Sequence, residues 1–214
     1  MTTVAIIDYG SGNLRSAARA FERMALPGQT IHITSSLADI AAASHIVLPG
    51  VGAFADCMTG LKAVNGMMEE LETQVLSRKK PFLGICVGMQ MLFEKGMEYG
   101  EHTGLGWLKG QVVRIENTDT TPPLKIPHMG WNDVTVKKPH PLLEGIASGD
   151  HFYFVHSYHA VCPHPEEVLA TVEYGRALTA MVAHDNIMGT QFHPEKSQEK
   201  GLRVIRNFLA SDVF

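Results

Sequence analysis

Short apolar runs alternate with helical patterns over the first 93 residues. Apolar or alternating residues predict strands at 4–7, 30–34, 45–48 and 82–85. Apolar residues at helical spacing predict helices at 14–24, 36–42, 54–78 and 89–93, the third of them broken near Asn65 and Gly66. Strands that alternate with helices are typical of a parallel doubly wound sheet, whose functional residues lie at the carboxyl ends of the strands.

The remainder of the chain has a different pattern. After Phe93, glycine-rich loops lead to short alternating runs at 111–115, 133–136, 151–155, 168–172 and 178–183, then to an apolar stretch at 187–192 and a last helix at about 197–210. These runs predict an antiparallel C-terminal half, either continuous with the first sheet or packed against it. No repeat or linker divides the chain. We therefore expect one α/β domain over residues 1–214, with a mostly parallel doubly wound sheet and flanking helices.

Composition narrows the class of protein. The 214 residues are 45% hydrophobic and 19% charged, which is ordinary for a globular protein. The net charge of −4, without a basic run, argues against a nucleic-acid surface. The first residues lack a positive signal-peptide region, and no stretch approaches the roughly 18 apolar residues of a membrane span. Three separate cysteines make no disulfide framework, so we expect a cytoplasmic protein without membrane contact.

Cys86 stands between a predicted strand and a predicted helix, flanked by Gly84 and Gly88. Gly-x-Cys-x-Gly in this setting is the cysteine counterpart of the nucleophile elbow, where flanking glycines permit a tight, strained turn. The turn would place the sulfur at the start of the helix, where unpaired N–H groups favour an anion, and would leave the Val87 N–H free to stabilise an oxyanion. A free cysteine is also a common core residue, so this motif alone leaves both interpretations open.

A thiol nucleophile needs a general base, and the base needs an acceptor that orients it. Among 11 histidines, His193 stands out because Pro194 disfavours helical backbone at the residue before it. His193 is thereby held extended at a strand end, and Glu195 is close enough in sequence to fold back onto its ring. Together with Cys86, these residues predict a Cys–His–Glu triad; a surface His-Pro turn is the alternative.

Three further motifs have alternative interpretations. The loop Gly10-Ser-Gly12 invites a phosphate-binding interpretation but lacks the complete dinucleotide-binding spacing. Residues 49–52, Pro-Gly-Val-Gly, either permit a peptide flip or form an ordinary strand-to-helix turn. A possible zinc set is His156, His159, Cys162 and His164. On a strand the first two would face opposite sides, and we expect neither a metal nor a cofactor.

The stretches Gly84-Ile-Cys-Val-Gly-Met-Gln90 and Phe192-His-Pro-Glu195 resemble the class I (triad) glutamine amidotransferases. Within that family, residues 7–14, 48–54, 127–132 and 193–197 are similar to the glutaminase subunits of imidazole glycerol phosphate synthases, and the resemblance covers nearly the whole chain. It implies a flavodoxin-like fold and hydrolysis of glutamine to glutamate and ammonia. It also implies a heterodimer with a synthase/cyclase subunit, which would use the ammonia to make imidazole glycerol phosphate and aminoimidazole carboxamide ribotide in histidine biosynthesis.

The same resemblance implies roles for individual residues. The Val51 N–H would supply the second oxyanion donor after a flip of residues 49–52. Because Gly50 and Gly52 flank this residue, the loop has two accessible peptide orientations, and we expect partner and nucleotide binding to bias the flip. The positions that match glutamine-holding residues are Gly52, Gln90, Glu98, Ser157 and Tyr158. The positions that match the partner interface, around the ammonia exit, are Asn13, Trp131 and Lys196.

Two other classes of protein would retain the fold. A catalytically silent scaffold subunit is disfavoured by the intact triad of Cys86, His193 and Glu195. A cysteine peptidase or other hydrolase with the same elbow would leave the Val51 loop and the Trp131 stretch without an explanation.

Overall fold

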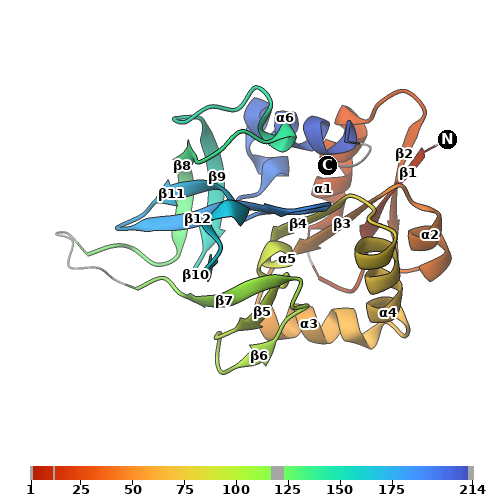
Figure 1. The fold of residues 1–214 in the computed structure, drawn as a ribbon, viewed down its shortest axis with the longest axis horizontal. Coiled ribbons are helices and arrows are strands. Elements are labelled where there is room, and N and C mark those ends of the chain that lie inside the picture. The colour runs from red at the N-terminus through yellow and green to blue at the C-terminus, as the bar shows by residue number, and fades with distance from the viewer. Residues whose placement is uncertain (1, 12, 117–122, 212–214) are drawn as a thin grey trace.

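A continuous nine-stranded sheet forms the centre of the computed structural model, which describes residues 2–11, 13–116 and 123–211. Its order is β2 (Gln29–Thr34), β1 (Thr2–Ile7), β3 (His45–Gly50), β4 (Phe82–Cys86), β13 (Ile187–Thr190), β12 (Ala177–His184), β11 (Val168–Glu173), β8 (His128–Val136) and β9 (His151–His156). The first five strands in this order are parallel, and each later pairing is antiparallel. The parallel part has the flavodoxin-like order, and the antiparallel half continues the same sheet (Figure 1).

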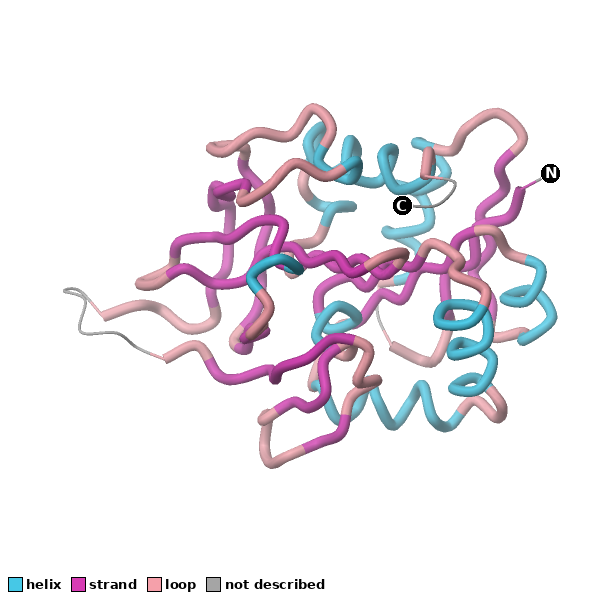
Figure 2. The backbone as a smooth tube through the Cα atoms, viewed as in Figure 1, coloured by secondary structure: helices cyan, strands magenta, loops and turns pink. Residues whose placement is uncertain are grey.

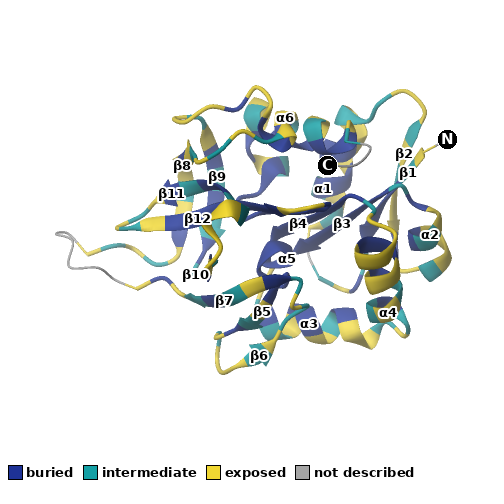
Figure 3. Cartoon of the chain, in the orientation of Figure 1, coloured by how far each residue is buried: buried dark blue, intermediate teal, exposed yellow. Residues whose placement is uncertain are grey.

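Helices cover both faces of the parallel half. On one side α1 (Leu14–Met24) packs against α6 (Gln198–Leu209), above the sheet in Figures 1 and 2. The other side holds α2 (Leu37–Ala42), α3 (Phe54–Ala63), α4 (Met67–Leu71) and the π-helical turn η1 (Glu72–Ser77). Strands β3 and β4 are buried along their whole length between these layers, as the dark blue centre of Figure 3 shows. Continuous apolar runs suit this position because neither face of such strands meets water.

A smaller second sheet lies beside the first, in the order β10 (Tyr158–Val161), β7 (Leu108–Arg114), β5 (Phe93–Gly96) and β6 (His102–Thr103). One expectation was wrong here: the helix predicted at 89–93 is the shorter α5 (Val87–Gln90), and Phe93 begins strand β5. Phe93 is fully buried and pairs with Leu108 of β7, so tertiary pairing overrides the helical spacing. The break predicted near Gly66 is confirmed, since Gly66 has φ 78° between α3 and α4.

Three 3₁₀ turns complete the described structure: η2 (Pro141–Leu143), η3 (Pro165–Glu167) and η4 (Pro194–Lys196). Each begins with proline, whose fixed φ suits the first helical position. Within residues 2–11, 13–116 and 123–211, none of the helices combines the length and apolar character that a membrane crossing requires.

Backbone packing around Cys86 leaves no room for side chains on the flanking glycines. A Cβ on Gly88 would lie 1.9 Å from the carbonyl oxygen of Leu48 in β3, and a Cβ on Gly84 would lie 2.6 Å from the carbonyl oxygen of Gly88. Both distances are far inside van der Waals contact, and the obstructing atoms are backbone. The two glycines are therefore required by close approach of α5 to β3 and β4.

We predict that Gly88→Ala lowers the free energy of unfolding by about 3 kcal/mol or more, because the backbone of β3 or α5 must move to admit the methyl group. Gly10→Ala is the matched control: Gly10 has φ +83°, but a Cβ there would meet nothing within 4 Å. Its cost should be limited to the backbone strain of about 1–2 kcal/mol. Urea denaturation measures both variants, and equal losses would contradict the packing argument.

Candidate active site

Cys86 ends β4 immediately before α5, at the edge of the sheet where β3 and β13 also end. Its backbone has φ 56° and ψ −112°, a conformation that a non-glycine residue adopts only under constraint. The strand–turn–helix context that the motif predicts is therefore present. Val87 opens α5, and the N–H groups of a first helical turn have no intrahelical acceptor.

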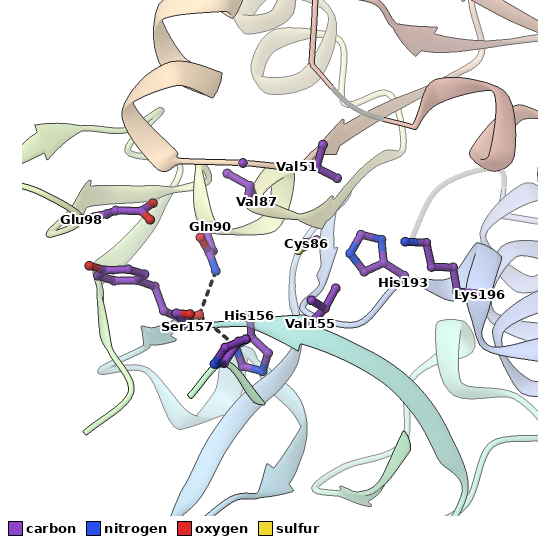
Figure 4. Close-up of a pocket in the computed structure, with 13 residues that line it drawn as sticks. Val51, Cys86, Val87, Gln90, Glu98, Val155, His156, Ser157, His193 and Lys196 are labelled. Carbon is purple, nitrogen blue, oxygen red and sulfur yellow. Dashed lines mark hydrogen bonds between the residues drawn. The ribbon is translucent and has the colours of Figure 1, made fainter. Parts of the chain in front are cut away.

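His193 and Glu195 follow β13, the strand next to β4. The Nδ1 atom of His193 lies 2.8 Å from Oε1 of Glu195, and both side chains are almost completely buried. The backbone around His193 is also fixed: its N–H donates to the Tyr153 carbonyl, and its carbonyl accepts from the Ser197 hydroxyl. The structure thus brings together the three residues of the predicted triad, since His193 and Cys86 line one pocket (Figure 4).

The charge state of His193 depends on these two neighbours. Burial lowers the pKa of its imidazole, but hydrogen bonds and electrostatic interactions with the Cys86 side chain and the Glu195 carboxylate outweigh burial. The pKa of His193 consequently rises from its ordinary 6.5 to about 9, which favours the protonated ring. A protonated imidazole at this position can donate a proton to a leaving group.

A pocket of about 410 Å³ opens in front of Cys86 and His193. The residues predicted to hold glutamine all line it: Gly52, Gln90, Glu98, Ser157 and Tyr158. Figure 4 shows Gln90 and Glu98 on the side of the pocket away from His193 and Lys196. A pocket of this size with few convergent polar groups is typical of a small-molecule site.

Two of these pocket residues have defined hydrogen bonds. Gln90 donates both amide hydrogens within the protein, to the Tyr158 carbonyl and to Oε1 of Gln191, each at 3.0 Å. Only its carbonyl oxygen therefore remains to accept from a ligand. Oε2 of Glu98 accepts the Phe54 N–H at 2.8 Å, which caps the start of α3 and fixes the carboxylate at the pocket wall.

Val51 lies at the pocket rim with its peptide groups engaged elsewhere. Its N–H donates to the Ser11 hydroxyl at 3.3 Å, and that hydroxyl donates to the Val51 carbonyl at 3.0 Å. The Cys57 thiol also donates to this carbonyl, at 3.4 Å. In the conformation described, Ser11 therefore occupies the N–H that the resemblance implies as the second oxyanion donor.

The three residues expected at a partner interface lie in three different places. Lys196 lines the active pocket, with its Nζ atom 5.8 Å from the centre of the Tyr153 ring. Trp131 is 47% exposed on β8 and borders a separate depression with His151 and Lys200. Asn13 precedes α1 and borders a cavity of about 10 Å³ behind the triad, beside Val51 and Glu195.

Sequence reasoning missed two residues at this site. Gln191 is fully buried, and its Nε2 atom lies 3.8 Å from the Cys86 sulfur. A polar residue inside the apolar stretch 187–192 was the available signal. Ser11 was considered only as part of a phosphate loop, and its contact with Val51 spans 40 residues of sequence that no local pattern reveals.

The structure also shows the surroundings of the possible zinc set and of the possible phosphate loop. In the described part of the chain, no three His, Cys, Asp or Glu side chains gather as a metal-binding group. Instead, His156 bonds to His128 and to the Tyr158 carbonyl, His159 to the Ala160 carbonyl, and Cys162 to Glu167. In the Gly10-Ser-Gly12 loop, Gly12 lies outside the described residues.

Comparison with known proteins adds to this geometry. Residues 5–211 match the family model described as glutamine amidotransferase class-I. The chain belongs to the class-I glutamine amidotransferase family.

Particular relatives resemble it over nearly their whole length. The chain is 56% identical to imidazole glycerol phosphate synthase subunit HisH of Rhodospirillum rubrum, with 96% of this chain and 97% of that protein covered. It is 53% identical to the subunit of the same name from Cereibacter sphaeroides, with 98% of each covered.

Solved structures support the fold alone. A glutamine amidotransferase crystal structure aligns with a TM-score of 0.71 at 22% identity, covering 96% of each chain. The structure of PurLQS from Thermotoga maritima aligns with a TM-score of 0.71 at 20% identity, covering 97% of each chain. The predicted α/β fold with a class I amidotransferase arrangement is confirmed.

We predict that Glu195→Gln lowers the pKa of His193 from about 9 by roughly one unit or more, because a neutral amide no longer attracts the imidazolium. The folded-state pKa lies above the ordinary 6.5, so the contact stabilises the fold fully below about pH 6.5 and ceases to do so as the pH rises through 9. The variant should therefore lose about 1–3 kcal/mol near pH 6 and much less near pH 10.

Histidine-ring NMR titration and urea unfolding at the two pH values measure these effects. Glu199→Gln, at an exposed carboxylate of α6, is the control and should change neither. A His193 pKa that stays near 9 in Glu195→Gln would contradict the assignment of Glu195 as its partner.

Proposed function

We propose that this chain hydrolyses glutamine to glutamate and ammonia as the glutaminase subunit of an imidazole glycerol phosphate synthase. The observation that carries the proposal is that His193, hydrogen-bonded to buried Glu195, lines one pocket with Cys86, within a chain 56% identical to a HisH subunit over nearly its full length. We further propose that residues 1–214 act as one domain, and that the protein works in the cytoplasm, without a cofactor.

In the proposed reaction, the Cys86 sulfur attacks the carboxamide carbon of glutamine. The imidazolium of His193 then gives its proton to the departing nitrogen, which leaves as ammonia, and a thioester with Cys86 remains. Neutral His193 next takes a proton from water, the hydroxide adds to the thioester, and glutamate leaves as the Cys86 sulfur is regenerated. Glu195 orients the ring and stabilises its charged form throughout.

The remaining pocket residues would bind the substrate. The free carbonyl oxygen of Gln90 and the carboxylate of Glu98 are acceptors that suit the ammonium group or amide hydrogens of glutamine. The backbone at Gly52, Ser157 and Tyr158 would close the pocket around it. These assignments agree with the pocket lining and with the positions that match glutamine-holding residues in the family.

Two backbone donors would stabilise the oxyanion that forms on the carboxamide oxygen. The Val87 N–H lies at the start of α5, next to the nucleophile. The Val51 N–H would be the second donor, but it is bonded to Ser11 in the conformation described. A flip of the Gly50–Val51 peptide would redirect it, and we propose that partner and nucleotide binding favour the flipped state.

The partner would be a synthase/cyclase subunit that accepts the ammonia and makes imidazole glycerol phosphate and aminoimidazole carboxamide ribotide in histidine biosynthesis. Asn13, Trp131 and Lys196 are the proposed contacts with this partner. Trp131 supplies an exposed aromatic ring of the kind that interfaces favour, and Lys196 lines the pocket itself. Ammonia would pass to the partner without release into solution.

The direct test is ammonia release from glutamine by the chain alone, with the synthase/cyclase subunit, and with that subunit plus its nucleotide ligand. We expect stoichiometric glutamate and ammonia, with the highest rate in the complete complex. Absence of hydrolysis in all three mixtures would favour a silent scaffold. Cleavage of peptide substrates in place of glutamine would favour a cysteine peptidase.

We predict that Cys86→Ser folds normally and abolishes glutamine hydrolysis, because a neutral hydroxyl is a much poorer nucleophile in a site built for a sulfur anion. Ammonia supplied from solution should still drive the partner's reaction. Glutamine-dependent activity near the wild-type level in this variant would remove Cys86 from the mechanism. Cys162→Ser, at a cysteine outside the pocket, is the control and should keep full activity.

We predict that Val51→Pro binds the partner but loses about 10²- to 10³-fold of the ligand-stimulated rate, because proline lacks the N–H of the second oxyanion donor. Val51→Ala retains that N–H and is the matched control. Ammonia-driven synthesis should survive in both. Undiminished stimulation in a correctly folded Val51→Pro protein would show that the second donor is another group.

A further inference from the structure

The amide of Gln191 is oriented toward the proposed nucleophile. Its Nε2 atom lies 3.8 Å from the Cys86 sulfur, within hydrogen-bond range for sulfur, and the side chain is fully buried. Its other end, Oε1, lies 3.0 Å from Nε2 of Gln90. A side-chain NH₂ group only donates, so Oε1 of Gln191 must be the acceptor there, and the NH₂ end must face the sulfur.

Gln90 is oriented in the same way. Its second amide hydrogen donates to the Tyr158 carbonyl at 3.0 Å, so the NH₂ group of Gln90 bridges Tyr158 and Gln191. Reversal of the Gln90 amide would set its carbonyl oxygen against two oxygen acceptors. The orientation of Gln191 therefore depends on where the Tyr158 carbonyl is held.

Two buried histidines hold that carbonyl. Nδ1 of His156 lies 2.9 Å from the Tyr158 oxygen, and Nε2 of His156 lies 2.9 Å from Nδ1 of His128. Asn132 donates through Nδ2 to Nε2 of His128 and also to the Glu173 carbonyl, while its Oδ1 accepts the Asp133 N–H. These contacts fix the orientation of the Asn132 amide. Its orientation in turn determines which atom donates and which accepts in each hydrogen bond from Asn132 to the Tyr158 carbonyl.

The tautomers are consequently determined. His128 accepts at Nε2 and donates from Nδ1, and His156 accepts at Nε2 and donates from Nδ1 to Tyr158. Both rings are neutral, because burial lowers the pKa of His128 to about 4 and that of His156 to about 3. Tyr174 and Phe154 stack on the His128 ring, with ring centres 4.1 and 4.9 Å away, and fix its plane.

We propose that Gln191 is a positioning residue for the Cys86 sulfur, and that the chain Asn132–His128–His156–Tyr158 carbonyl–Gln90 sets its orientation. The inference concerns the glutamine hydrolysis proposed above and in that respect rests on it. An N–H directed at the sulfur stabilises its anion and selects one side-chain rotamer of Cys86 for attack. This series of hydrogen bonds also connects β8, which carries exposed Trp131, to the proposed nucleophile.

The test measures alkylation of Cys86 by iodoacetamide across a pH range, resolved from Cys57 and Cys162 by mass spectrometry of peptides. This reaction needs no glutaminase activity. The other titratable groups that act on Cys86 are His193 in the pocket, and Tyr9 and Cys57 behind it. These groups are the same in the wild type and in the variants below. A shift in the midpoint of the alkylation profile therefore reports the loss of the Gln191 N–H donor.

Gln191→Leu keeps the volume and removes the donor. We expect the midpoint of its alkylation profile to move to higher pH, the alkylation rate near neutral pH to fall about tenfold, and kcat for glutamine to fall about tenfold to a hundredfold, with KM within roughly threefold. Gln191→Glu keeps an acceptor for Gln90 and sets a negative charge beside the sulfur, so its midpoint should move further. It replaces the first variant if Gln191→Leu does not fold.

Two more variants complete the design. His128→Phe retains the stacked ring but neither accepts from Asn132 nor donates to His156, and should move the midpoint in the same direction by a smaller amount. Thr190→Val removes a buried hydrogen bond next to Gln191, to the Phe192 carbonyl, that is not part of the chain. It should leave the midpoint unchanged.

The outcomes separate the two proposals. A folded Gln191→Leu or Gln191→Glu protein with the wild-type alkylation profile overturns the positioning role, whatever the glutaminase rate. A displaced profile in a protein whose wild type hydrolyses no glutamine supports the positioning role and overturns the proposed function. An equal displacement in Thr190→Val would show general disturbance of the strand end and would also overturn the role of Gln191.

Discussion

The close backbone contact between the Cys86 turn and β3 determines the geometry of the whole site. Gly88 packs against the Leu48 carbonyl, and a Cβ on Gly50 would lie 2.6 Å from the Gly88 nitrogen. With no side chains at these positions, the turn is confined at its strained φ of 56°. The same contact fixes the Val87 N–H relative to the segment that carries Val51, so one packing interaction sets the nucleophile and both proposed oxyanion donors.

Sheet register then explains how residues a hundred positions apart meet. Thr190 of β13 pairs with Ile85 of β4, so the chain beyond β13 leaves the sheet beside Cys86. Gln191 and His193 follow at once, on a segment held by the Tyr153 and Ser197 contacts. The burial that accompanies this arrangement would neutralise an isolated imidazole. Because Glu195 and Cys86 are both within reach of His193, its pKa rises instead of falling.

The sequence was sufficient for features that local patterns encode. The buried strands, the elbow around Cys86 and the break at Gly66 follow from apolar runs and glycine positions. Strands β5, β6 and β10 have two to four residues, too few for a periodic signal, and exist because of their pairing with β7 or with one another. The roles of Ser11, His128 and Gln191 depend on hydrogen bonds across 28 to 105 residues of sequence. Periodicity carries no information about such contacts.

The two sides of the site differ in how firmly their hydrogen bonds are fixed. The Val51 N–H donates to the Ser11 hydroxyl at 3.3 Å, and the Val51 carbonyl, in the next peptide, accepts from that hydroxyl and from the Cys57 thiol, at a residue 40% exposed to water. Water can replace these partners, so exchanging them costs little free energy. The Gln191 amide is fully buried, and turning it would leave donors and acceptors unpaired along the chain from Gln90 to His128. The proposed nucleophile is therefore the rigid part of the site, and the Val51 N–H, the proposed second oxyanion donor, is the adjustable part. In such a site, the proposed partner would change the stability of the transition state through the Val51 N–H, without any movement of Cys86, His193 or Glu195.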